Sequence, residues 1–142
     1  MKVAIINGPN LNMLGVREPD VYGDLSLDSI MVDLRKKHPD CKILDFQSND
    51  EGSLIDAIQE LGMSSDGVII NPGGYSHTSV AIRDAIASVN SPVIEVHISN
   101  IHSREEFRHT TITGGACVAV ISGLGADGYS VALEHLRTLQ NS

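Results

Sequence analysis

The stretch GVIIN at residues 67–71, followed by PGGYSHTS at residues 72–79, decides the fold class of this chain. Its first part is a short apolar run rich in β-branched residues, and it ends at an asparagine and a glycine turn, as a buried strand does. Similar Val- and Ile-rich runs lie at residues 2–7, 42–48, 92–97 and 116–122. We therefore predict five β-strands at these positions.

The segments between these runs carry apolar residues every three or four positions, which predicts helices. We expect the first helix to be capped by Ser26 and to end before Pro39, and the second to cover 51–61 with Gly62 closing it. The third helix should run from about 76–78 to Val89, and the last should cover roughly 126–139. This alternation predicts an α/β, flavodoxin-like three-layer fold. We expect a five-stranded parallel sheet of order 2-1-3-4-5 that binds its ligand beyond the carboxyl ends of the strands.

Composition limits the possible functions. The 142 residues are 42% hydrophobic, contain no Trp and carry a net charge of -8, so we expect one domain over residues 1–142 with an aliphatic core. The acidic surface argues against nucleic acid or a membrane as partner. Cys41 and Cys117 form no paired motif and no leader or spanning segment is apparent, so we expect a cytoplasmic protein with reduced thiols.

Polar residues collect where the predicted strands end. These residues are Asn7, Asn10, Asn71, Glu95, His97 and Ser99. Because residues i and i+2 share one face of a strand, Glu95 can orient the His97 imidazole and raise its basicity, which makes an acid/base pair. A buried Glu and His satisfied by backbone groups is the alternative for one such pair alone, but the convergence of the other loops favours chemistry.

A long, turn-rich connection at residues 8–24 is typical of a lid over a site. It contains Arg17 and Tyr22, and Arg104 and Arg108 follow the fourth strand. A tyrosine ionises near pH ~10, so it can act as a base at neutral pH only where cations stabilise the phenolate. Arg17 and Arg104 are the candidates for that role; the alternative is that the arginines are solvated and Tyr22 packs the lid.

The predicted start of the third helix places backbone amides and His77 where they could contact an anionic or polar ligand, although capping by Ser76 or Thr78 would explain much of this motif. Asp84 lies on the same helix face, roughly 10 Å further along the axis at 1.5 Å per residue. His77 and Asp84 are therefore poorly placed to share one small ligand within one chain.

Other motifs are weaker. Gly123, Gly125 and Gly128 spell GxGxxG, but after the last strand this indicates a tight turn with close helix packing and not a nucleotide site. No metal site is predicted. Ser76-His77 keeps a Ser/His hydrolase open as an alternative, although no GxSxG elbow is present. A flavodoxin-like binding module, either a receiver or a flavin carrier, is a further alternative; a receiver would need acids where Asn7 and Asn71 stand.

Five ordered motifs resemble those of the type II 3-dehydroquinate dehydratases over nearly the whole chain. They are INGPNLN at 6–12, REPDVYG at 17–23, NPGGYSHTS at 71–79, EVHISN at 95–100 and REEFR at 104–108, and GLGADGY at 123–129 follows them. The resemblance implies a flavodoxin-like fold, a cofactor-independent hydro-lyase of the shikimate pathway acting on 3-dehydroquinate, and a dodecamer built from trimers. Biosynthetic and quinate-degrading roles both stay open.

The resemblance also implies residue roles. Tyr22 takes a proton beside the substrate ketone with support from Arg17, and His97, oriented by Glu95, protonates the departing hydroxyl. Asn10 places the histidine and a water that stabilises the enolate. The implied substrate contacts are Asn71, His77 and Arg108 for ring hydroxyls, the Ile98 amide and Ser99 for the carboxylate, and Asp84 for the site of a neighbouring subunit. Where the family more often has His-Ser-Tyr, this chain has Thr110-Thr111-Ile112.

Overall fold

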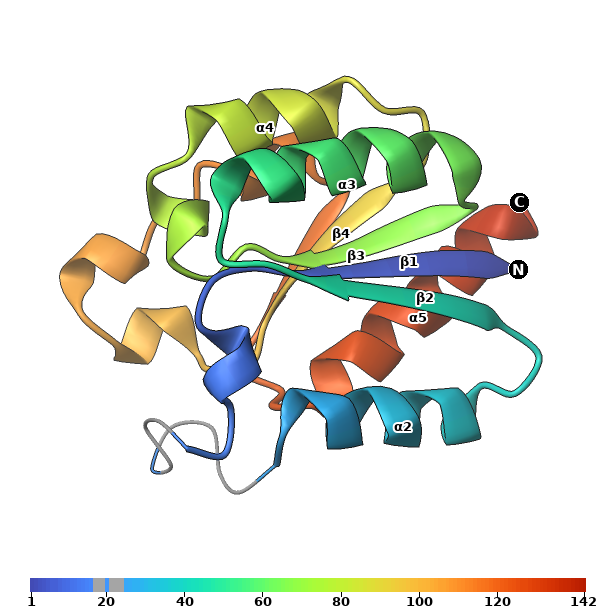
Figure 1. Ribbon diagram of the computed structural model, residues 1–142, viewed down its shortest axis with the longest axis horizontal. Helices are drawn as coiled ribbons and strands as arrows, with labels where there is room; N and C mark the ends of the chain where they lie inside the picture. Colours follow the sequence, from blue (N-terminus) through green and yellow to red (C-terminus); the bar gives the residue numbers. More distant parts are fainter. Residues whose placement is uncertain (17–19, 21–24) are drawn as a thin grey trace.

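The computed structural model describes residues 1–16, 20 and 25–142 of the chain (Figure 1). Within these residues the parallel strands form one sheet of order β2-β1-β3-β4-β5, which confirms the predicted topology. The strands are β1 (Lys2–Asn7), β2 (Lys42–Gln47), β3 (Gly67–Asn71), β4 (Val93–His97) and β5 (Ala119–Ser122). The longer helices are α2 (Leu27–Lys37), α3 (Glu51–Ser64), α4 (Val80–Ala87) and α5 (Asp127–Gln140). The short 3₁₀ helices are η1 (Leu11–Met13), η2 (Gly73–His77), η3 (Ile101–Ser103), η4 (Glu106–Arg108) and η5 (Gly114–Ala116).

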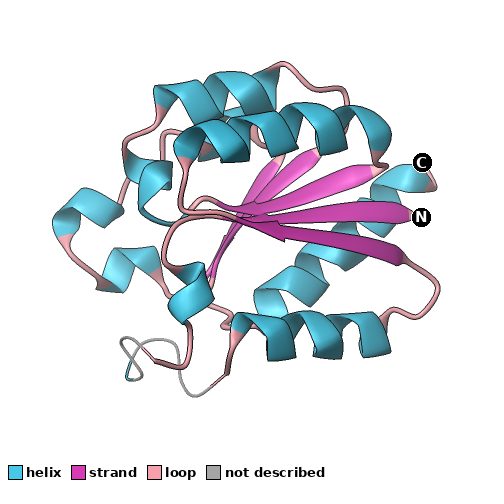
Figure 2. Ribbon diagram, viewed as in Figure 1, coloured by secondary structure: helices cyan, strands magenta, loops and turns pink. Residues whose placement is uncertain are grey.

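Helices cover both faces of the sheet, with α3 and α4 on one side and α2 and α5 on the other (Figures 1 and 2). Alternate residues of each strand point to opposite faces. In β1, Val3 and Ile5 join the core beneath α2 and α5, whereas Ala4 and Ile6 join the core beneath α3 and α4. Because both faces are buried, the strands read as continuous apolar runs in the sequence.

Helix α3 continues past the glycine that was expected to close it. Gly62 lies inside the helix and is buried, so the predicted end at Leu61 is wrong. A Cβ atom at position 62 would lie 2.8 Å from the side-chain carbons of Val89, beyond the end of α4. Glycine is therefore present here because α3 and the chain after α4 approach closely, and not because the helix must end.

Helix α4 also differs from the prediction. Residues Gly73–His77 form the 3₁₀ helix η2, and α4 begins only at Val80 and ends at Ala87. The hydroxyl of Ser79 accepts from the Ile82 amide at 2.9 Å and caps α4. Several hydroxyl residues in a row could each cap a helix, and the local sequence does not distinguish them.

Strand β5 is shorter than expected, since Gly114–Ala116 form η5 and the strand begins at Ala119. The other strand bounds agree with the prediction to within one residue, and the hydroxyl of Ser26 caps α2 as expected. The glycine motif after β5 is a turn, as predicted: Gly123 and Gly125 have φ of +93° and +61°. A Cβ at Gly128 would lie 3.0 Å from Val96, so this glycine lets α5 pack closely against the sheet.

The segment after β1 runs along the carboxyl edge of the sheet and contains η1. Asn10, directly before η1, has a left-handed backbone with φ of 71°, a conformation that asparagine tolerates better than most residues. The predicted lid continues through Arg17 and Tyr22, which lie outside the described residues. No helix in the described part of the chain is long and apolar enough to cross a bilayer.

Candidate active site

A pocket of about 120 Å³ opens at the carboxyl ends of β1, β3 and β4. This is the edge where a flavodoxin-like sheet is expected to bind ligands. The pocket brings together six residues expected from the sequence, namely Asn10, Asn71, His77, His97, Ile98 and Ser99. Two further expected residues, Arg104 and Arg108, line the same pocket.

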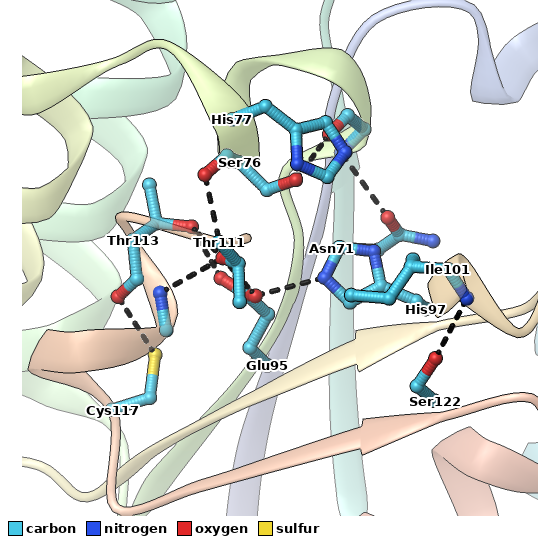
Figure 3. A network of polar contacts seen from close by, with 12 residues as sticks. Asn71, Ser76, His77, Glu95, His97, Ile101, Thr111, Thr113, Cys117 and Ser122 are labelled. Atoms are coloured by element: carbon cyan, nitrogen blue, oxygen red, sulfur yellow. Dashed lines mark hydrogen bonds and ion pairs between the residues drawn. The ribbon is translucent and has the colours of Figure 1, made fainter. Parts of the chain in front are cut away.

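Glu95 and His97 project from the same face of β4 and contact each other (Figure 3). The His97 Nε2–H donates to Oε2 of Glu95 at 2.8 Å. Glu95 has no exposed surface, while 5% of His97 remains exposed and the residue lines the pocket. The predicted contact between the two side chains is confirmed: a buried carboxylate fixes one ring nitrogen and thereby orients the imidazole at the pocket.

Glu95 is bound by two more donors that the sequence did not suggest. The hydroxyl of Thr111 donates to Oε2 at 2.6 Å, and the hydroxyl of Thr113 donates to Oε1 (Figure 3). Burial on its own would raise the pKa of this carboxyl group. The hydrogen bonds from His97, Thr111 and Thr113, together with the His97 charge, outweigh burial and leave the pKa of Glu95 below its ordinary value. The site therefore holds an acceptor behind His97 that is charged at neutral pH.

His77 comes from η2, which the glycine turn after β3 starts. Its Nδ1–H donates to the Thr110 carbonyl at 2.8 Å, which leaves Nε2 for another partner. The ring lies nearly parallel to His97, with 6.2 Å between the ring centroids. The two imidazoles thus form one side of the pocket. His97 is held by Glu95 of its own strand, and His77 is held by the Thr110 carbonyl of another segment.

Asn71 ends β3 and joins two parts of the site. Its side-chain oxygen accepts from the Gly73 amide at 3.1 Å, and its Nδ2 donates to the hydroxyl of Tyr129 at 3.3 Å. The Tyr129 hydroxyl donates in turn to Oδ1 of Asn7 at 2.5 Å. Asn7 pairs with Asn71 across β1 and β3 and is 1% exposed, so it supports the site from below and does not line the pocket.

Tyr129 is the tyrosine that sequence reasoning missed as a supporting residue. It is fully buried on α5, and burial raises the pKa of its phenol, so it stays neutral and serves as a hydrogen-bonding link. The available signal was its place at the end of the motif at 123–129, although its partners lie 58 and 122 residues away in the chain.

The basic wall comes from the η3–η4 segment. The Arg108 Nε–H donates to Oε2 of Glu105 at 2.6 Å, and its guanidinium lies 4.9 Å from the centre of the Phe107 ring. The same hydrogen bond and the nearby Arg104 charge lower the pKa of the exposed Glu105. A wall of this kind attracts an anionic acid in an otherwise acidic protein.

Further residues from the loops after β1 and β4 complete the surface of the pocket. Asn10 is exposed there, and its amide donates to Asn49 at 3.0 Å, which anchors the turn before η1. Ile98 and Ser99 follow directly after β4 and line the pocket. Leu11 and Ile101 add apolar contacts that the sequence analysis did not single out.

Asp84 does not belong to this pocket. It is exposed on α4 and is not among the residues that line the cavity, in agreement with the expected difficulty of sharing a ligand with His77. The remaining expected residues, Arg17 and Tyr22, lie in the part of the chain that the structure does not describe.

The geometry also disfavours the hydrolase alternative. Ser76 is fully buried, and its hydroxyl donates to the Gly73 carbonyl at 2.8 Å. The Nδ1 of His77 is bound to Thr110, so the two residues are not arranged as nucleophile and base. Among the described residues, no group of three His, Cys, Asp or Glu side chains is placed to bind a metal ion.

A second hollow of about 450 Å³ lies between β2 and α3. Its charged lining residues are Asp45, Asp56 and Glu60, and none of the residues that line it is basic. Such a surface repels carboxylates. The pocket at the carboxyl edge is therefore the candidate active site, since it combines basic residues with the hydrogen-bonded Glu95 and His97.

Comparison with known proteins places the chain in a family. The family model described as dehydroquinase class II matches residues 1–137. The chain is 51% identical to a 3-dehydroquinate dehydratase of Aliarcobacter butzleri, covering 99% of this chain and 87% of that protein. It is 53% identical to one of Halothermothrix orenii, covering 94% and 91%. A crystal structure of type II dehydroquinase from Butyrivibrio crossotus superimposes with a TM-score of 0.91 at 47% identity, covering 96% of this chain and 97% of that one. This chain belongs to the class II dehydroquinase family.

Proposed function

We propose that this protein is a 3-dehydroquinate dehydratase, a hydro-lyase that converts 3-dehydroquinate to 3-dehydroshikimate and water in the shikimate pathway. The family and the names of its relatives support this activity. The observation that carries this proposal is the contact between Glu95 and His97. The Glu95 carboxylate is charged and buried, and His97 lines a pocket that also contains basic residues.

The first chemical step is removal of a proton from the carbon beside the substrate ketone. We assign this step to Tyr22 as tyrosinate, supported by Arg17, with Arg104 adding positive charge from the pocket wall. The electrons of the broken C–H bond form an enolate. A water held by Asn10 stabilises the enolate oxygen.

The second step is loss of the hydroxyl group by anti elimination. Since Glu95 holds the proton on Nε2 of His97, the proton transferred to the departing hydroxyl comes from Nδ1 of the imidazolium. The C–O bond breaks as the enolate collapses to the conjugated ketone, and water leaves. Return of the proton from Tyr22 to His97 restores both groups, so no cofactor is needed.

The substrate contacts follow the lining of the pocket. Asn71, His77 and Arg108 bind the ring hydroxyls, and the Ile98 amide with Ser99 binds the carboxylate. These groups are donors or neutral acceptors that line one pocket, which suits a polyhydroxylated acid.

We also propose that Asp84 serves the site of a neighbouring subunit in a dodecamer built from trimers. Asp84 and Val80 lie four residues apart on α4, so they share one face, and Val80 is 60% exposed. An exposed valine beside a carboxylate is typical of a subunit contact. Residues 1–142 act as one catalytic domain, and the thiols of Cys41 and Cys117 are unpaired, which suits the cytoplasm.

The direct test is an assay of purified protein with 3-dehydroquinate and without added metal or nucleotide. We expect absorbance of the conjugated enone to grow with time. A Tyr22→Phe variant with unchanged circular dichroism is the matched control and should show no growth. Folded wild-type protein that leaves 3-dehydroquinate unchanged would disprove the proposed activity, and an active Tyr22→Phe variant would disprove only the role of the base.

A further inference from the structure

We propose that Thr111 and Thr113 are positioning residues that hold the Glu95 carboxylate in one orientation and thereby align His97 for proton transfer. This inference rests on the proposed role of His97 as the acid. It concerns the segment in which this chain departs from the motif common in the family.

The two hydroxyls bind different oxygens of the carboxylate (Figure 3). Thr111 donates to Oε2 at 2.6 Å, where His97 also binds, and Thr113 donates to Oε1. A carboxylate held at both oxygens cannot rotate about its final bond without losing a charged hydrogen bond. His97 therefore meets an acceptor of fixed direction.

The Thr111 hydroxyl is itself oriented. The Gly114 amide donates to its oxygen at 3.1 Å, so the single hydroxyl proton is free to point at Glu95. Two other acceptors lie within reach, the Ser76 carbonyl at 3.3 Å and the Thr113 hydroxyl oxygen at 3.2 Å, and both are farther and uncharged. The bond to the carboxylate at 2.6 Å is consequently the stronger one.

The segment that carries both threonines is anchored to neighbouring elements. The Ile112 amide donates to the Ser76 carbonyl of η2 at 2.8 Å. The Arg83 guanidinium on α4 donates to the Ile112 carbonyl at 2.5 Å. The carbonyl of Thr110, two residues earlier, accepts from His77. One stretch of four residues thus holds both histidines of the pocket, His97 through Glu95 and His77 directly.

Gly114 shows how closely this arrangement is packed. A Cβ at that position would lie 3.2 Å from Oε2 of Glu95, 2.9 Å from the methyl carbon of Thr111 and 2.8 Å from Val120. A side chain there would press on the carboxylate and on the residue that binds it. The chain therefore carries a glycine directly after Thr113, where the two hydroxyls need space to reach Glu95.

The pair can be tested with Thr113→Val and Thr111→Val, which remove a hydroxyl at nearly constant volume. We expect kcat to fall roughly tenfold or more, as for loss of a hydrogen bond to a charged group, with KM changed by less than about twofold because neither residue lines the pocket. Removing a donor raises the pKa of Glu95, so the fall of activity at acid pH should begin at higher pH. Thr113→Ser should restore both kcat and the acid limb of the pH profile, that is, the pH at which activity begins to fall on the acid side.

Thr138→Val is the matched control, since its hydroxyl donates to the His135 carbonyl on the exposed end of α5. It should match wild type in kcat and in the acid limb. A double-mutant cycle with Glu95→Gln adds a second measurement: if the threonines act through the carboxylate, Thr113→Val should cost much less in the Glu95→Gln background.

Wild-type kcat and an unshifted acid limb in both valine variants would overturn the proposal. A loss of kcat that Thr113→Ser does not restore would also overturn it, as would kcat effects of Thr113→Val and Glu95→Gln that are simply additive in the double-mutant cycle. If Thr113→Val does not fold, as judged by circular dichroism, Thr111→Val and its cycle decide. Failure of the proposed function gives a different pattern, because wild-type protein would then leave 3-dehydroquinate unchanged. An active His97→Ala variant would refute the acid on which this inference rests.

Discussion

Glu95 is a carboxylate with no exposure to solvent, which would be strongly destabilising without partners. Three side-chain donors surround it, and they come from β4 itself and from the segment before η5. The carboxylate stays ionised at neutral pH because these hydrogen bonds lower its pKa more than burial raises it. The cost of burying the charge is offset locally, and the result is a histidine held in one orientation.

Replacing His97 tests the acid directly. We expect His97→Ala to lower kcat by about 10²–10⁴-fold, the usual range for loss of an acid/base group. His97→Gln should be similarly inactive, but its amide can still donate to Glu95, so its free energy of unfolding should stay closer to wild type. Steady-state kinetics and denaturant unfolding measure the two effects. His135→Ala on the exposed face of α5 is the control, and a near-normal rate for either His97 variant would eliminate the residue as the acid.

Replacing Tyr129 tests the link below the pocket. Tyr129→Phe removes the hydroxyl that joins Asn7 and Asn71, and leaves two buried amide groups without that partner. We expect the free energy of unfolding to fall by about 1–3 kcal/mol, and KM to rise because Asn71 lines the pocket. Tyr75→Phe is the control, since the Tyr75 hydroxyl donates only to the Asn49 carbonyl at 3.3 Å in an exposed setting. Equal stability of the two variants, measured at matched protein concentration, would contradict this role.

The beginning of α4 illustrates how an element is positioned by contacts outside itself. Ser79 accepts from Ile82 as the cap, and its own hydroxyl proton is donated to Oε2 of Glu51 in the first turn of α3 at 2.6 Å. Ser79 is 3% exposed. One side chain thus starts α4 and joins α4 to α3.

We therefore expect Ser79→Ala to destabilise the protein by about 2–4 kcal/mol, the cost of a lost cap together with a lost hydrogen bond to a charged group. Ser26→Ala is the comparison, because Ser26 caps α2 at an exposed site by accepting from Ser29 at 3.1 Å. Ser26→Ala should lower the free energy of unfolding by less than Ser79→Ala does. Thermal and denaturant unfolding measure both variants, and a Ser79→Ala variant as stable as Ser26→Ala would show that the link to α3 contributes nothing.

The whole molecule leaves apolar side chains on its surface at the β5 edge of the sheet and on α4. Val118 is 59% exposed and Val120, on the edge strand β5, is 42% exposed. Val80 is exposed beside Asp84 on α4, which contacts η5. An edge strand with exposed valines favours association with another chain over a free monomer.

If Asp84 acts in a neighbouring site, two inactive variants should complement each other. Co-expressed Asp84→Ala and His97→Ala chains should recover about a quarter of wild-type activity, because random mixing places both native residues at about one site in four. Light scattering should give twelve times the 15.2 kDa of one chain. Each variant should be inactive when expressed alone. If the mixed oligomers then recover no activity, Asp84 acts in the site of its own chain or outside catalysis.

Local patterns predicted most of the fold. The continuous Val and Ile runs identified the strands because a strand buried on both faces needs apolar residues throughout. The Ser26 cap and the glycine turn after β5 were also correct, since capping and left-handed turns depend on neighbouring residues in the chain. Because parallel strands end at one edge of a sheet, the strand assignment alone was enough to predict that Asn71, Glu95 and His97 lie together.

Tertiary contacts decided what these patterns left open. Gly62 stays within α3 because Val89 packs against it, and Ser79 starts α4 because it also binds Glu51. The Tyr129 hydroxyl binds Asn7 across 122 positions of sequence, and Thr113 binds Glu95 across 18. The sequence by itself determined where the strands lie, the sheet edge and the contact between Glu95 and His97, because these follow from periodicity and from neighbours along one chain. Only the tertiary structure selected the hydroxyls that hold Glu95, because hydrogen-bond partners depend on distances in space between segments that no local pattern relates.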